Sequence, residues 1–229
     1  MKNKFLLILG LITLFTFSVF SVIGAEPNGA GVSGETIIEG LGPSSSSQAN
    51  LYAGNITEAV LTTNVSTSRW AGFSGNASGN IQLGDSSNNL FYQWTARGRM
   101  VYISNSSTVT WASLADANEA AVTNIYTYIS GDSVGDNYSM TFNESAENIG
   151  SEIYPAITSD YAKTWDNTNS GVWKTYSLTD GTHIVWAGRV LTNQVNWRGL
   201  DSDFQMIVPE YGVGNTVVTE NYYVWVELR

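Results

Sequence analysis

Residues 69–94 read RWAGFSGNASGNIQLGDSSNNLFYQW, and this stretch decides the fold class. Aromatic residues gather at its two ends, and four glycines divide the short apolar runs between them. Gly75-Asn76 and Gly84-Asp85 are dipeptides typical of turns. Short runs rich in aromatic and β-branched residues between such turns predict strands. The stretch therefore predicts strand, turn, strand, turn, strand within an all-β domain.

Apolar runs of strand length continue on both sides of this stretch. Residues 56–65 predict a central strand, because their apolar side chains fall on both faces. The strands expected further along the chain are 99–104, 107–111, 138–142, 173–178, 182–192, 203–208 and 216–228. Strands at this spacing, joined by Gly, Asn and Asp turns, predict a β-sandwich or jelly-roll-like domain.

One segment has helical rather than strand periodicity. Leu114, Ala117 and Ala121 recur at the spacing of one helix face. Ser113 followed three residues later by Asp116 forms a weak capping box. The sequence therefore predicts one short helix over residues 114–124, lying over one end of the sheets.

The first 25 residues have the pattern of a secretory signal peptide. Two lysines precede an almost wholly apolar run over residues 5–22, and Gly24-Ala25 supplies small residues at the cleavage position. We expect residues 1–25 to be removed after Ala25. The alternative is an uncleaved anchor, because an apolar run of about 18 residues can span a bilayer. Both readings place the remaining chain outside the cytoplasmic membrane, secreted or at the cell surface.

The following segment, residues 26–50, is a Gly/Ser/Pro-rich leader, a composition typical of flexible spacers. Within it, Ile37-Ile38 is the only pair of adjacent large apolar residues. Such a pair could add as an exchange strand to the sheet edge of a neighbouring copy. Residues 51–229 are expected to form a single β-sandwich domain.

Composition excludes several classes of partner and chemistry. The formal net charge is −10, so we expect no nucleic-acid binding, and membrane contact only through an uncleaved signal segment. Cysteine is absent and His183 is the only histidine, which leaves too few nitrogen and sulfur ligands for zinc. His183 follows a predicted turn, and no Gly-x-Ser-x-Gly motif is present. We therefore assign no catalytic residue and expect a non-enzymatic protein.

Paired carboxylates keep one enzymatic alternative open. A glycoside hydrolase built on a β-sandwich needs two acidic side chains at a defined separation. Five acids lie near the ends of predicted strands: Asp201, Asp203, Glu210, Glu220 and Glu227. Because the chain has twenty acidic residues, such pairs also arise by chance.

Several motifs together resemble a known group of proteins. They are RWAGFSGNASGNIQL, the following Tyr92-x-Trp94, SNSSTVTW with a short helix after it, DFQMIVPE, and the closing YYVWVEL. From about Asn55 onward the chain is similar to a largely uncharacterised group of predicted secreted surface proteins of archaea. The resemblance implies an extracellular compartment and a β-rich fold, and no activity.

Three kinds of site follow from residue type. Six sequons predict N-glycosylation: Asn55, Asn64, Asn76, Asn105, Asn137 and Asn143. Oxygen-rich loops make Asp201, Asp203, Asp132 and Asp136 weak candidates for Ca²⁺, the only cofactor considered, against the alternative of solvated turn residues. Trp165, Trp173 and Trp197 lie in or beside loops and are candidate ligand platforms, whereas Trp70, Trp94, Trp186 and Trp225 are expected in the core or on a sheet face.

These observations predict a glycosylated structural or adhesive subunit of the archaeal cell envelope. Its expected partners are other copies of itself or other envelope proteins, with filaments formed by strand exchange. The first alternative is a carbohydrate-binding, lectin-like module whose partners are glycans. The second is the glycoside hydrolase.

Overall fold

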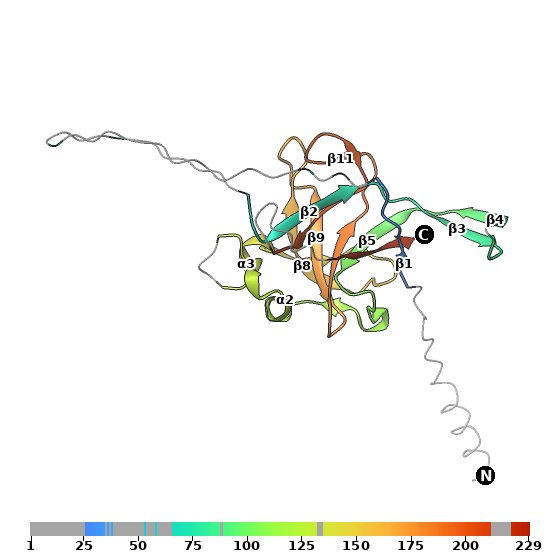
Figure 1. Cartoon of the computed structure of the whole chain (residues 1–229), viewed down its shortest axis with the longest axis horizontal. Coiled ribbons are helices and arrows are strands. Elements are labelled where there is room, and N and C mark those ends of the chain that lie inside the picture. The colour runs from blue at the N-terminus through green and yellow to red at the C-terminus, as the bar shows by residue number, and fades with distance from the viewer. Residues whose placement is uncertain are drawn as a thin grey trace, which may run out of the picture.

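The computed structural model describes residues 26–34, 36, 38, 53, 58, 66–87, 89–131, 135–211 and 221–229. Its main element is an eight-stranded sheet. The strands are β1 (Asn28–Gly29), β5 (Gly98–Ser104), β6 (Ala115–Asp116), β7 (Glu144–Asn148), β8 (Thr158–Thr164), β9 (Trp173–Thr179), β10 (Ile184–Arg189) and β14 (Tyr223–Leu228). They pair antiparallel in the order β1-β14-β5-β10-β9-β8-β7, with β6 also paired to β9 (Figure 1).

Three smaller antiparallel pairs complete the strands. β2 (Trp70–Gly75) pairs with β13 (Phe204–Pro209), and this pair packs on one face of the large sheet. β11 (Gln194–Val195) pairs with β12 (Asp201–Ser202). β3 (Asn80–Gly84) and β4 (Leu90–Thr95) form a hairpin. The prediction of an all-β, sandwich-like domain is confirmed.

The central strands are apolar on both faces because both faces of the large sheet are covered. In β5, Val101 and Ile103 point to one side and Met100 and Tyr102 to the other, and all four are buried. The neighbouring strand β10 continues both rows in the same way. Such two-sided burial is typical of the inner strands of a layered β domain.

The first core lies between the large sheet and the β2–β13 pair. Trp186 of β10 is its centre, with ring centroids 6.2 Å from Trp70, 5.4 Å from Phe142 and 6.0 Å from Tyr126. Phe142 and Tyr126 follow the short helices, so the helices close the part of this face that two strands leave open.

The second core covers the opposite face with loops and a 3₁₀ turn. Tyr102 packs edge-on against Trp111, and Trp111 packs edge-on against Trp225. Other buried residues on this face are Met100, Leu114, Ile149, Tyr161, Tyr176, Leu178, Val185 and Ala187. Trp70 and Trp186 are thus buried as expected, and Trp225 is partly buried against this core.

The predicted helix exists but begins five residues late. It is α2 (Glu119–Ile125), whose first turn is capped by Asn118, the side chain of which accepts a hydrogen bond from the Ala121 amide at 2.9 Å. Residues 115–116 instead form β6, and Ser113 ends the 3₁₀ turn η1 (Trp111–Ser113). A second 3₁₀ turn, η2 (Thr127–Ile129), follows α2. The predicted strand 107–111 is wrong, because only its last residue joins an element, η1.

Residues 138–142 were expected as a strand and fold instead into the helix α3 (Tyr138–Thr141). The Asn137 side chain caps it by accepting from the Met140 amide at 2.8 Å. Tyr138 and Phe142, four residues apart, stack with centroids 4.9 Å apart on one helix face. The alternation that suggested a strand therefore carries a helical i, i+4 pair.

The beginning of the leader lies on the edge of the large sheet. Asn28 pairs with Val226 and Gly29 with Trp225, and the Ala30 amide donates to the Val224 carbonyl at 2.8 Å. Ile38 is exposed, whereas Ile37 and the predicted strand 56–65 lie outside the described residues. Among the described residues no helix is long and apolar enough to cross a membrane.

Candidate functional site: two exposed aromatic surfaces

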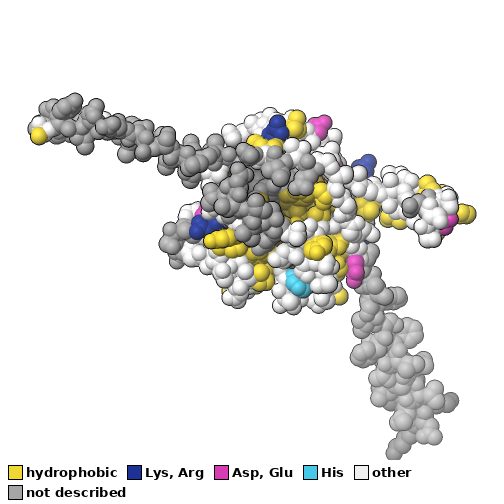
Figure 2. All heavy atoms as spheres, in the orientation of Figure 1, with side chains coloured by type: hydrophobic (Ala, Val, Ile, Leu, Met, Phe, Trp, Pro, Cys, Tyr) yellow, Lys and Arg dark blue, Asp and Glu magenta, His cyan; other side chains and the backbone are white. Residues whose placement is uncertain are grey.

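The β3–β4 hairpin, residues 80–95, extends from the domain as an arm (Figure 1). Its register places Ile81 opposite Trp94 and Leu83 opposite Tyr92. Because side chains alternate between the faces of a strand, these four residues share one side, and we call them the apolar face of the arm. All four are exposed, and patches of yellow side chains are visible on the arm in Figure 2.

The opposite face of the arm is polar at its centre. Gln82 lies opposite Gln93, and the Gln82 amide donates to the Gln93 side-chain oxygen at 3.1 Å. Phe91, 83% exposed, lies two residues before Gln93, beside the irregularity where Gly84 pairs with Leu90. The arm thus has one apolar face and an opposite face with a glutamine pair and one exposed aromatic ring.

The tip of the arm is a well-braced turn. The Asp85 carboxylate accepts hydrogen bonds from the Ser87 amide at 2.9 Å and the Asn89 amide at 2.8 Å. Gly84 is required here, because a Cβ would lie 2.8 Å from the Asn89 carbonyl oxygen. The Asn89 side-chain amide also donates to the Asp85 carboxylate. That side-chain bond has the largest effect, and together the three bonds keep the pKa of Asp85 below its usual value. The predicted Gly84-Asp85 turn is confirmed.

Trp94 was expected in the core or on a sheet face, and it lies on a sheet face. Its side chain is 48% exposed and packs edge-on against Tyr92 of the same strand, with centroids 4.9 Å apart. The last strand of the 69–94 stretch is present as β4. Nothing in the alternation of its side chains distinguishes a covered apolar face from an open one.

A second aromatic surface is formed by two of the three candidate platform residues. Trp165 directly follows β8 and is 62% exposed, and Trp197 lies between β11 and β12 and is 50% exposed. Trp173 is 1% exposed in β9, and its indole N–H donates to the Val195 carbonyl at 3.0 Å, so its platform assignment is wrong. The buried Gln205 joins the other two, as its side chain binds the backbone of both Trp165 and Trp197.

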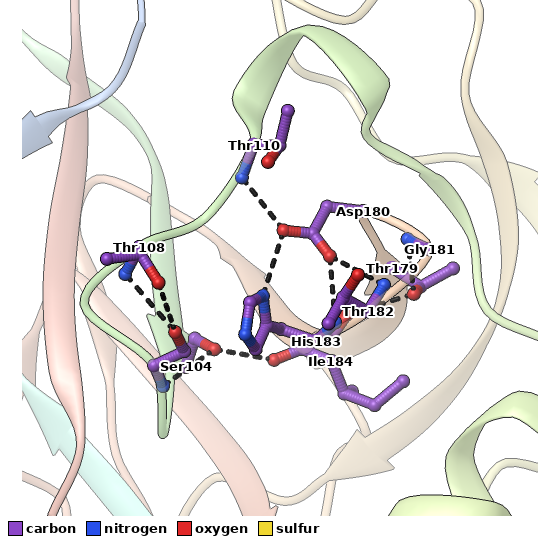
Figure 3. A network of polar contacts seen from close by, with 10 residues as sticks. Ser104, Thr108, Thr110, Thr179, Asp180, Gly181, Thr182, His183 and Ile184 are labelled. Atoms are coloured by element: carbon purple, nitrogen blue, oxygen red, sulfur yellow. Dashed lines mark hydrogen bonds and ion pairs between the residues drawn. The ribbon is translucent and has the colours of Figure 1, made fainter.

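His183 serves a turn, as Figure 3 shows. Its ring Nδ1 lies 3.1 Å from the carboxylate of Asp180, and its backbone amide donates to the same carboxylate at 2.7 Å. Asp180 also accepts from the amides of Thr182 at 2.9 Å and Thr110 at 2.8 Å. In Figure 3 the nearby Ser104 hydroxyl is directed to the Ile184 carbonyl, 2.8 Å away, and supplies no bond to the imidazole. The arrangement ties the β9–β10 turn to the segment before Trp111.

The carboxylate of Asp180 is held in its charged form. Burial alone would raise its pKa, but the backbone bonds from Thr110, His183 and Thr182 and the His183 ring outweigh burial, so its pKa is well below the ordinary value. A carboxylate that accepts several N–H bonds is stabilised in this way.

Glu227 and Asp203, two of the acids near strand ends, are hydrogen-bonded within the fold. Glu227 is fully buried and accepts hydrogen bonds from Tyr102 at 2.9 Å, Ser151 at 2.8 Å and the Glu152 amide at 2.7 Å. Burial and this neighbouring carboxylate raise the pKa of Tyr102 far above its usual value. Glu227 therefore anchors the 151–153 loop to β14. Glu220 lies outside the described residues.

The calcium candidates do not converge in the described part of the chain. Asp136 forms an ion pair with Arg69 at 2.6 Å and accepts from the Thr67 hydroxyl at 2.5 Å. Asp203 accepts from the Ala77 amide at 3.0 Å, whereas Asp201 is exposed. No group of three or more metal-ligating side chains forms among the described residues, and Asp132 is not one of them.

Sequon positions differ sharply in accessibility. Asn76, Asn105 and Asn143 are exposed. Asn137 is buried, and its amide nitrogen, the atom to which a glycan would attach, donates to the Gly131 carbonyl at 2.7 Å. Burial of Asn137 and this bond from its amide nitrogen oppose glycosylation in the folded protein. Asn55 and Asn64 lie outside the described residues.

The comparisons with known proteins give no family. No family model matches the chain, and neither a curated protein nor a solved structure matches it. The candidate surfaces therefore rest on their own geometry.

Proposed function

We propose that this protein is a secreted, N-glycosylated structural or adhesive subunit of a cell surface, and that copies of it associate through the apolar face of the arm. The observation that carries the proposal is the arm itself. Six of its side chains are large, apolar and exposed in the single chain, and four of them, Ile81, Leu83, Tyr92 and Trp94, lie on one side of the extended ribbon. Contiguous exposed apolar surface of this kind is characteristic of association sites.

A second copy of this chain is the occupant that suits the arm best. Two identical ribbons can stack face to face, so that Ile81, Leu83, Tyr92 and Trp94 of each copy meet in a dry layer. The Gln82–Gln93 faces would then point to solvent. A contact of this type uses the same patch on both copies and is compatible with two-fold symmetry.

A lipid surface suits the arm less well. The tip, which would have to enter a bilayer first, carries Asp85 and a run of Ser and Asn residues. Residues 80–95 contain no lysine or arginine that could attract anionic headgroups. The acidic net charge of the protein also opposes binding to anionic headgroups.

The size of the arm sets the strength of the contact. Four half-exposed side chains supply on the order of 400 Å² per copy, about half of the roughly 800 Å² of a standard interface. The arm alone therefore supports a weak pair, and a stable assembly needs a second contact. The leader offers one, because the backbone bonds of Asn28 and Gly29 to β14 can form equally within one chain or between two.

The non-enzymatic part of the proposal is supported by the roles of the reactive groups. His183 and Asp180 brace a turn, and Glu227 anchors a loop. The charged residues of β7 to β10 form an ion-pair network, with Glu147 bound by Lys174 at 2.5 Å and Arg189 at 3.0 Å.

The test is the assembly state of the secreted protein, measured by sedimentation over a range of concentrations and by electron microscopy. One variant replaces residues 81–94 by Asn-Gly, a turn that rejoins the paired Asn80 and Thr95. A second carries Leu83→Asn and Trp94→Ser, and its matched control carries Gln82→Ala and Gln93→Ala on the polar face. We expect the first two to remain monomeric with the body folded, and the control to assemble as the parent does. Assembly that survives loss of the arm refutes the proposal.

A further inference from the structure

Two exposed tryptophans on neighbouring loops are positioned by one buried amide. The Gln205 Nε2 of β13 donates to the Trp165 carbonyl at 3.0 Å and to the Thr164 hydroxyl at 2.8 Å. Its Oε1 accepts from the Trp197 amide at 3.0 Å. Gln205 is buried, so the two loops are fixed relative to each other by a group that solvent does not reach. The indoles of Trp165 and Trp197 nevertheless face solvent.

Each loop is also rigid by itself. After Trp165, the Asp166 carboxylate accepts from the amides of Thr168 at 2.8 Å and Ser170 at 2.9 Å. Before Trp197, the Asn196 side chain accepts from the amides of Arg198 at 2.9 Å and Leu200 at 3.2 Å. Side-chain bonds of this kind restrict the loops, so that the adjoining Trp165 and Trp197 have little conformational freedom. This restriction lowers the entropic cost of binding a ligand.

The two loops touch at a glycine. Gly199 has φ +76°, and a Cβ there would lie 2.8 Å from the side-chain nitrogen of Asn167 in the other loop. The backbone conformation favours glycine at this position, and a larger residue would also displace the Asn167 side chain. The pair of tryptophans thus belongs to one built surface and not to two independent loops.

Polar side chains lie close to the apolar rings on this surface. The Arg198 guanidinium lies 5.9 Å from the Trp197 ring centroid, and the Asn167 amide lies between the loops. Trp165 and Trp197 do not form a ring pair with each other or with another described aromatic residue. The surface therefore offers two separate flat apolar faces with hydrogen-bonding groups beside them.

We propose that the surface formed by Trp165 and Trp197 binds a neutral oligosaccharide. A pyranose ring has an apolar C–H face that stacks on the electron-rich face of an indole, and hydroxyls at its rim for polar neighbours. With two separate indoles on one surface, each can stack on a different sugar unit of one oligosaccharide chain. A neutral sugar is favoured over an acidic one, because the net charge of the protein repels anions. This site is distinct from the arm and does not depend on self-association.

The test is titration of the secreted protein with neutral glucan, mannan and chitin oligosaccharides of four to six units, followed by calorimetry. We expect one class to bind. Trp165→Ala and Trp197→Ala should each weaken that binding by about tenfold or more, as aromatic anchors of small interfaces do. Tyr223→Ala is the matched control, since it removes an aromatic ring of similar exposure from β14, outside both surfaces, and should bind as the parent does.

Thermal unfolding of the two loop variants shows whether a loss of binding reflects a loss of folding. Because their indoles are exposed, we expect both variants to unfold at nearly the melting temperature of the parent. The inference is overturned if no oligosaccharide of the panel binds. It is equally overturned if both loop variants bind like the parent, or if Tyr223→Ala weakens binding as much as they do. Retention of self-association in the loop variants, with loss of sugar binding, would show that the two surfaces act separately.

Discussion

Truncating Trp70 and Trp94, two indoles of one sequence stretch, should have very different effects on stability. Trp70 is buried, with ring centroids 5.9 Å from Phe142 and 6.2 Å from Trp186, and its indole N–H donates to the Asp136 carbonyl at 2.7 Å. Trp70→Ala leaves a cavity in the first core and an unpaired carbonyl. Large-to-small changes of this kind lower the free energy of unfolding by about 3–5 kcal/mol.

Trp94→Ala removes contacts that are mainly with Tyr92 and the cross-strand Ile81. A cross-strand pair contributes about 0.2–1 kcal/mol to the free energy of unfolding. For a chain of this size each kcal/mol lowers the melting temperature by about 2–4 °C. We therefore expect a melting temperature lower by roughly 6–20 °C for Trp70→Ala and by at most about 4 °C for Trp94→Ala.

Urea unfolding followed by tryptophan fluorescence and by far-ultraviolet circular dichroism gives both free energies. Measuring at low protein concentration keeps self-association from adding to the apparent stability. Similar losses in the two variants would refute the reasoning, since they would mean that the arm is covered in the folded chain. A loss below about 1 kcal/mol for Trp70→Ala would refute the assignment of the first core.

Three further predictions concern Asp180, the sequons and the signal peptide. Because the pKa of Asp180 is lowered by folding, the unfolded state binds more protons in acid, so this group's contribution is present above about pH 4 and is lost below it. The stability difference between the parent and Asp180→Asn should narrow as the pH falls below about 4 in a denaturation series, and a constant difference would contradict this. Glycopeptide mass spectrometry of protein from the native host should find glycans on Asn76 and Asn105 and none on Asn137. N-terminal sequencing should begin after Ala25, and a start at Met1 would mean an anchor.

Strands whose burial is uniform could be predicted from the sequence, and elements that depend on local capping could not. β5 and β14 fall within predicted runs because their apolar residues fill both faces or alternate cleanly. β7 and β8 were missed, since ESAEN and TSDYAKT carry charges and small residues that read as loop. The helix α3 was taken for a strand, because its cap at Asn137 and the stacking of Tyr138 on Phe142 become visible only once the turn has formed.

The sequence also predicted only part of the two candidate surfaces, because their exposure depends on tertiary packing. Loop position predicted exposed side chains for Trp165, Trp173 and Trp197. The first and last are exposed, whereas the regular strand β9 carries Trp173 into the interior. Gln205 gave no signal, because a glutamine in an apolar strand looks like an ordinary polar interruption until both loops are seen around it. The arm was readable as a hairpin, whereas its exposure depends on the tertiary position of β3 and β4.

The pairing of β1 with β14 has a consequence for the time course of folding. Asn28 pairs with Val226, and Trp70 in β2 pairs with Pro209 in β13, so the earliest strands find their partners only near the other end of the described chain. Contacts of such long sequence separation form slowly, because a large loop must close before they add stability. A nascent chain that lacks β14 leaves one side of β5 unpaired. If the protein is exported as proposed, it can thread through a narrow channel without refolding on the way, and the sheet closes once the whole domain has crossed.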